Sequence, residues 1–187
     1  MDTSDIRKGL KLKLDGQGPY TVVDFQFVKP GKGQAFTRLK IKHLVTGAVL
    51  ERTFKSGESL DHADVEEREA QFSWEEGDQL VFVDGNSDQI YVDVAKIGDD
   101  RKWIADGQKV SIVFYEGNAV AVSLPAHVVL QITGSEPGVK GDTASGASKP
   151  ATLSSGATIN VPLFVKEGEW VKVDTRTGEY LERVNLK

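Results

Sequence analysis

Lys32 lies at the centre of a Pro-Gly-Lys-Gly segment that runs from Pro30 to Gly33 and is followed by Gln34. Proline fixes φ and glycine tolerates positive φ, so Gly31 and Gly33 predict a chain reversal with Lys32 at its apex. The two glycines also leave no side chains to crowd the lysine, whose four-carbon arm carries a point charge. On the loop alone, an ordinary solvated turn lysine is the simpler interpretation.

A cationic strand follows this loop. Arg38, Lys40 and Lys42 alternate with less polar residues, so the two-residue period of a strand places the three cations on one face. Lys29 adds a further positive charge just before the tip at Lys32. A cationic face beside a cationic tip fits a phosphate backbone. A strand face that meets only water is the competing interpretation.

Other chemistry has little support in the sequence. The absence of cysteine excludes thiol catalysis, disulfides and Cys-based metal sites, and the three histidines are scattered. The segment around Lys32 lacks the upstream glycine spacing and the Ser or Thr of a phosphate-binding P-loop. Asp61-His62-Ala63-Asp64 contains possible metal ligands, although a polar boundary turn explains it more simply. We therefore expect neither a catalytic site, nor a metal, nor a cofactor.

The composition favours an all-β protein. The chain of 187 residues contains 22 Val, 8 Ile and 11 Thr, whose β-branched side chains suit pleated sheets. Short apolar or alternating runs recur between turn signals, which is typical of small barrels. Only residues 63–71 and 99–105 are compatible with a helix. We expect the three tryptophans, Trp74, Trp103 and Trp170, to anchor barrel cores or interfaces rather than stack on bases.

Charge divides the chain into three segments. Residues 1–57 carry 11 basic and 5 acidic side chains, residues 66–126 carry 5 and 13, and residues 127–187 carry 7 and 7. We place domains at 1–64, 65–126 and 127–187, since about 60 residues suffice for a small barrel. One larger sandwich is the alternative. The absence of a long apolar run predicts a cytoplasmic protein without membrane contact.

Two sets of motifs resemble elongation factor P of bacteria. The first set matches the first domain of that family, through Lys29 to Phe36, Leu44 to Gly47 and Thr53 to Lys55. The second set matches its last domain, through Pro137 to Ala144, Lys149 to Leu153, Val161 to Val165 and Val173 to Tyr180. The middle third matches chiefly through its length, its acidity and the stretch from Ala95 to Asp99.

This resemblance implies an SH3-like (KOW-type) first domain and two OB-like domains in an L-shaped arrangement similar to a tRNA. It implies a monomeric, non-catalytic factor that binds the ribosome beside the peptidyl-tRNA and stimulates peptide-bond formation at consecutive prolines. A lysine-modifying enzyme is implied to extend Lys32. Gly141, Asp142 and Thr143 match a loop that faces messenger RNA, although a flexible connection has the same composition. An unmodified OB/SH3 RNA-binding module without stall-relief activity is the alternative function.

Overall fold

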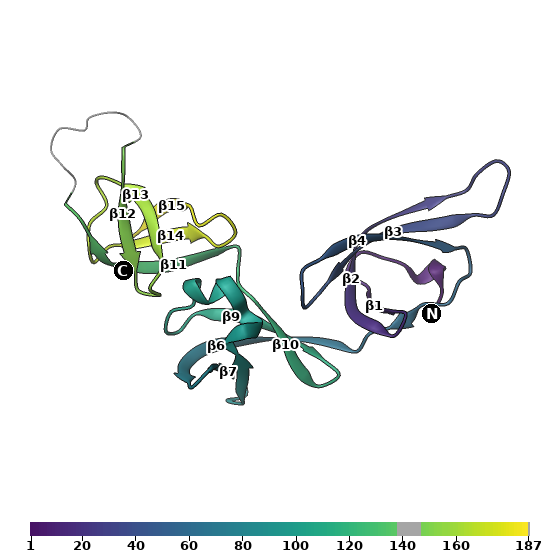
Figure 1. Cartoon of the computed structure of the whole chain (residues 1–187), viewed down its shortest axis with the longest axis horizontal. Coiled ribbons are helices and arrows are strands. Elements are labelled where there is room, and N and C mark those ends of the chain that lie inside the picture. The colour runs from purple at the N-terminus through teal and green to yellow at the C-terminus, as the bar shows by residue number, and fades with distance from the viewer. Residues whose placement is uncertain (138–146, 187) are drawn as a thin grey trace. The chain divides into compact units, whose positions relative to one another are not determined.

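The computed structural model describes residues 1–137 and 147–186, and most of them lie in β-strands. Three five-stranded sheets follow one another along the chain (Figure 1). The all-β class predicted from the β-branched residues is confirmed. No helix among the described residues is long and apolar enough to cross a membrane.

The first sheet has the strand order β4-β3-β2-β1-β5. Its strands are β1 (Lys11–Leu14), β2 (Gln17–Val28), β3 (Phe36–His43), β4 (Val49–Lys55) and β5 (Asp61–His62), preceded by the 3-10 helix η1 (Thr3–Asp5). Leu12, Leu39 and Ile41 are fully buried in its core. The turn expected over Asp61-His62-Ala63-Asp64 is wrong for its first two residues, because they form β5, which pairs with β1.

The second and third sheets share one topology. The second contains β6 (Val65–Glu76), β7 (Gln79–Asp84), β8 (Gln89–Asp93), β9 (Lys109–Tyr115) and β10 (Asn118–Ser123) in the order β10-β9-β6-β7-β8. The third contains β11 (His127–Ser135), β12 (Ser148–Leu153), β13 (Thr158–Pro162), β14 (Trp170–Asp174) and β15 (Tyr180–Val184) in the order β13-β12-β11-β14-β15. In each sheet the first strand therefore lies between the second and the fourth.

One of the two helix-compatible segments is a strand. Residues 63–71 are rich in glutamate, yet β6 begins within them, and Ala70 and Phe72 are buried where β6 pairs with β7. Sheet pairing and burial override the local helix propensity here. The other segment, residues 99–105, overlaps the 3-10 helix η2 (Gly98–Trp103), which follows the single-turn helix α1 (Val94–Ile97).

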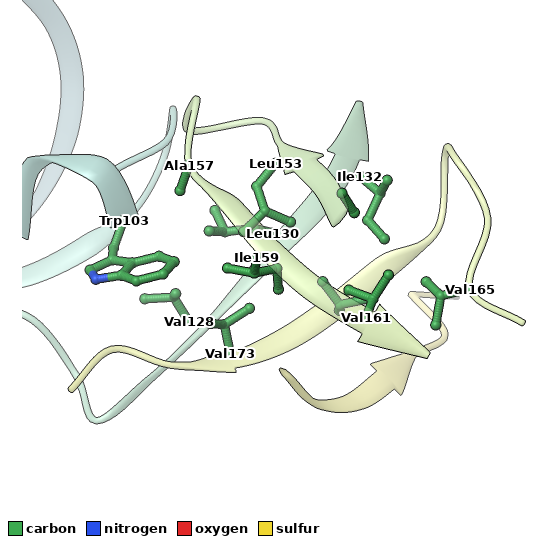
Figure 2. Packing of buried hydrophobic residues seen from close by; sticks show 12 residues of the cluster. Trp103, Val128, Leu130, Ile132, Leu153, Ala157, Ile159, Val161, Val165 and Val173 are labelled. Atoms are coloured by element: carbon green, nitrogen blue, oxygen red, sulfur yellow. The ribbon is translucent and has the colours of Figure 1, made fainter. Parts of the chain in front are cut away.

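Trp103 of η2 belongs to the core of the third sheet. Its side chain is buried among residues of that sheet, and Figure 2 shows the ring beside Val128 and Val173. A Cβ added at Gly178, which has φ +74°, would lie 3.4 Å from the ring, so glycine leaves room for the indole. Trp103 is thus a core anchor as predicted. Trp74, with 39% of its surface exposed, is not in a core.

The chain forms two compact units, residues 1–68 with 113–121 and residues 69–112 with 122–187. The first unit thus includes the tip of the β9–β10 hairpin. Lys13 forms a salt bridge with Glu116, a hydrogen-bonded contact that raises the pKa of the lysine. The Arg68 guanidinium lies 4.5 Å from the centre of the Phe114 ring. These contacts attach the hairpin tip to the first unit.

Candidate functional site

The β2–β3 hairpin can be followed in Figure 1. Lys32 lies at the centre of the loop that joins its two strands. The last pair of the strand register is Val28 with Phe36, so residues 29–35 continue beyond the hydrogen-bonded ladder. Lys32 is exposed, and no ion pair within the described part of the chain involves it. The local sequence explains the reversal, since proline and glycine interrupt two strand-forming runs.

The two glycines beside Lys32 differ in conformation. Gly33 has φ +122°, a value that L side chains rarely adopt, and a Cβ there would lie 3.7 Å from Pro30 Cγ. Gly31 does not have positive φ, and a Cβ there would meet open space. The expected positive φ is therefore correct for Gly33 and wrong for Gly31, because a loop over residues 29–35 spreads the reversal along the chain. Gly31 still leaves the space beside Lys32 empty.

The basic residues of β3 share one face of the strand. Arg38, Lys40 and Lys42 are exposed, whereas Leu39 and Ile41 between them are fully buried. This is the alternation that the sequence predicts. The cations of β3 thus remain accessible to a phosphate backbone while the apolar residues hold the strand on its core.

Two acids lie opposite one of these cations. In the strand register, Lys40 pairs with Asp24 on β2 and with Glu51 on β4, whereas the partners of Arg38 are uncharged. Lys8 Nζ lies 3.0 Å from Asp24 Oδ1, and its hydrogen bond lowers the pKa of that carboxyl group. Directly opposed charges of opposite sign attract. The positive charge of Lys40 is therefore partly compensated by the acids directly opposite it, whereas the residues directly opposite Arg38 carry no charge.

Sequence reasoning missed this compensation and also the opposite face of the hairpin. Phe25 and Phe27 are 40% and 58% exposed, and both line a surface hollow with Thr37. Their alternation with Asp24 and Gln26 in the sequence was the signal for a two-faced strand. The hairpin therefore has a polar, cation-bearing face and an aromatic face.

Gly141, Asp142 and Thr143 lie outside the described residues. A hydrogen bond connects the described residues before and after them: the buried Lys149 Nζ donates to the Glu136 carbonyl oxygen at 2.9 Å. Within residues 1–137 and 147–186, no group of three or more His, Asp or Glu side chains is placed to hold a metal ion.

Comparison with known proteins identifies the family of the chain. Three family models match in succession: the elongation factor P KOW-like domain over residues 2–60, the elongation factor P OB domain over 65–122 and the elongation factor P C-terminal domain over 128–183. The chain belongs to the elongation factor P family. Elongation factor P 2 of Protochlamydia amoebophila is 52% identical, with 99% of this chain and 98% of the relative covered. Elongation factor P of Natranaerobius thermophilus is 46% identical, with 97% of both covered.

Membership of the elongation factor P family makes this chain a translation elongation factor, and the KOW-like and OB domains agree with the predicted architecture. A solved structure described as eukaryotic translation initiation factor 5A from Methanococcus jannaschii superimposes with a TM-score of 0.50 at 19% identity. It covers 65% of this chain and 92% of its own. At this identity the likeness concerns the fold alone.

Proposed function

We propose that this elongation factor binds the ribosome beside the peptidyl-tRNA and stimulates peptide-bond formation at consecutive prolines through a modified Lys32. The observation that carries the proposal is the exposure of Lys32 at the hairpin tip, without an ion pair inside the described regions. A side chain that is not engaged within its own protein is available for a partner. The loop residues Pro30, Gly31, Gly33 and Gln34 present it.

The mechanism is positional. A peptide that ends in proline leaves the peptidyl-tRNA poorly oriented, and a long cationic arm along the phosphates of its CCA end holds it in a reactive geometry. Fixing two reactants lowers the entropic part of the barrier, while the bond-forming chemistry stays with the ribosome. An unmodified lysine is too short for this contact, so the proposal includes an enzyme that extends Lys32.

The remaining contacts follow from charge. Lys29, Arg38, Lys40 and Lys42 are exposed and would meet RNA phosphates. Gly141, Asp142 and Thr143 would face messenger RNA. We assign these roles to domains at 1–64, 65–126 and 127–187, which is supported by one complete five-stranded sheet within each range.

Synthesis of a reporter with a Pro-Pro-Pro stretch, in a reconstituted translation system, tests the proposal. Lys32→Ala is expected to abolish stall relief without lowering the melting temperature, because truncation of an exposed tip residue removes no burial. Lys55→Ala removes another exposed lysine of the same unit and serves as the matched control, with full activity expected. Normal synthesis with Lys32→Ala would remove this lysine from the mechanism.

The mass of the Lys32 peptide from native cells distinguishes the alternative function. A mass above that of the unmodified peptide supports the proposed extension. An unmodified peptide, together with direct affinity for RNA in the absence of ribosomes, would instead favour an RNA-binding module without stall-relief activity.

A further inference from the structure

A β-bulge directs Trp74 away from the barrel interior. In the register of β6 with β7, Phe72 pairs with Phe82 and Trp74 pairs with Val81, so Ser73 is the extra residue. Ala70 and Phe72 are buried, and regular alternation would turn Trp74 inward as well. Bulges re-aim side chains in this way. The sheet thus places a large aromatic residue on its outer face.

Trp74 is part of a row across three strands. Val81 pairs with Trp74 on one side and with Tyr91 of β8 on the other, and directly opposed side chains point to the same face. Val81 is fully buried, whereas Trp74 and Tyr91 are 39% and 44% exposed. We call Trp74, Val81 and Tyr91 the aromatic row. Its two rings flank an aliphatic floor and remain open to solvent.

The surroundings of the aromatic row are acidic. Residues 69–93, which contain the whole row, include seven acids and no Lys, Arg or His. The neighbouring row across the same strands is Glu76, Gln79 and Asp93, in which Gln79 Nε2 donates to Asp93 Oδ1 at 2.7 Å. Of these two carboxylates, Asp93 also lies 3.8 Å from Lys96 Nζ. Glu75, next to Trp74 in the sequence, is paired with Arg101, whose Nη2 lies 2.8 Å from Glu75 Oε2. Glu76 and Asp93 are therefore the carboxylates that the neighbouring row brings to the face of the two rings.

Exposed aromatic rings beside carboxylates favour a positively charged partner over nucleic acid. Single-stranded nucleic acid binds aromatic platforms that lie in a positively charged groove, and carboxylates would repel its phosphates. A guanidinium or ammonium group instead gains from an aromatic face and from a nearby carboxylate. We propose that the aromatic row binds an arginine- or lysine-rich protein segment. This surface is additional to the RNA contacts of the first unit, and the proposal stands whether or not Lys32 acts on the ribosome.

Isothermal titration of the full chain with a synthetic peptide of alternating arginine and glycine tests the proposal. The double variant Trp74→Ala/Tyr91→Ala is expected to weaken binding about tenfold, since two cation–π contacts are lost. Phe164→Ala is the matched control, because Phe164 is 60% exposed in the turn after β13, outside the second sheet, and its removal keeps the net charge. Its affinity for the peptide is expected to equal that of the unaltered chain.

A second variant covers the case in which the double variant does not fold. Tyr91→Lys changes a single exposed position and adds a positive charge, so it should weaken peptide binding at least as much. Unchanged affinity in the folded double variant or in Tyr91→Lys would overturn the proposal, as would an equal loss in Phe164→Ala. Tighter binding of polyuridylate than of the peptide, lost in the same variants, would identify a nucleic-acid surface. Self-association lost in these variants would identify a second copy as the occupant.

Discussion

The β2–β3 hairpin carries Lys32 beyond the first sheet, and the η2 segment carries Trp103 beyond the second sheet. The two side chains differ in burial. The hairpin leaves Lys32 exposed to solvent. The η2 segment places Trp103 in the core of the third sheet, with 3% of its surface exposed. An exposed residue such as Lys32 can contact a partner, and its replacement costs little folding stability. A buried residue such as Trp103 instead stabilises the unit in which it is packed.

Removal of the buried Trp103 side chain should have the largest effect. Trp103→Ala is expected to lower the free energy of unfolding by about 3–5 kcal/mol, through lost burial and the cavity that it leaves. Chemical denaturation of the full chain, followed by circular dichroism, measures this change. Phe164→Ala, which removes an exposed ring of the same unit, should cost far less. Equal losses in the two variants would show that Trp103 is not a structural anchor.

The modification and activity of Lys32 should depend on the backbone conformation of its loop rather than on burial. Gly33→Ala forces a side chain to adopt φ +122° and is expected to cost about 1–3 kcal/mol of local strain, which redirects the tip. Gly31→Ala should be nearly neutral. The extent of Lys32 modification and the Pro-Pro-Pro reporter are measured on one preparation of each variant. If Gly31→Ala is as harmful as Gly33→Ala, the positive φ is not the property that matters.

The smallest expected effect is a difference between Arg38 and Lys40, two cations on one face of the hairpin, in the salt dependence of ribosome binding. Arg38→Ala is expected to reduce the slope of log affinity for ribosomes against log salt by about 0.9, the value for one lost phosphate contact. Lys40→Ala should reduce it by less, since Asp24 and Glu51 lie opposite this lysine. Equilibrium binding over a range of salt concentrations provides both slopes. Identical slopes in the two variants would mean that the acids do not compensate Lys40.

Most strands could be predicted because they alternate apolar and polar residues, as β3 does from Arg38 to Lys42. The strands β6 and β12 could not. The glutamates of β6 have helix propensity, and only pairing with β7 makes a strand the better solution. In β12 the sequence contains Pro150, and proline argues against a strand because it cannot donate a hydrogen bond to a neighbouring strand. It is tolerated because β12 pairs with β11 only from Ala151 onward.

The sequence by itself determined the composition of the tip, the exposure of Lys32 and the common face of Arg38, Lys40 and Lys42. These features depend on backbone preferences and strand periodicity over a few residues, which act in any context. Only the tertiary structure decided which acids face Lys40, which core receives Trp103 and to which side Trp74 points. Strand register, packing between sheets and a one-residue bulge set these outcomes, and each depends on segments that are distant in the sequence or on the partner strand.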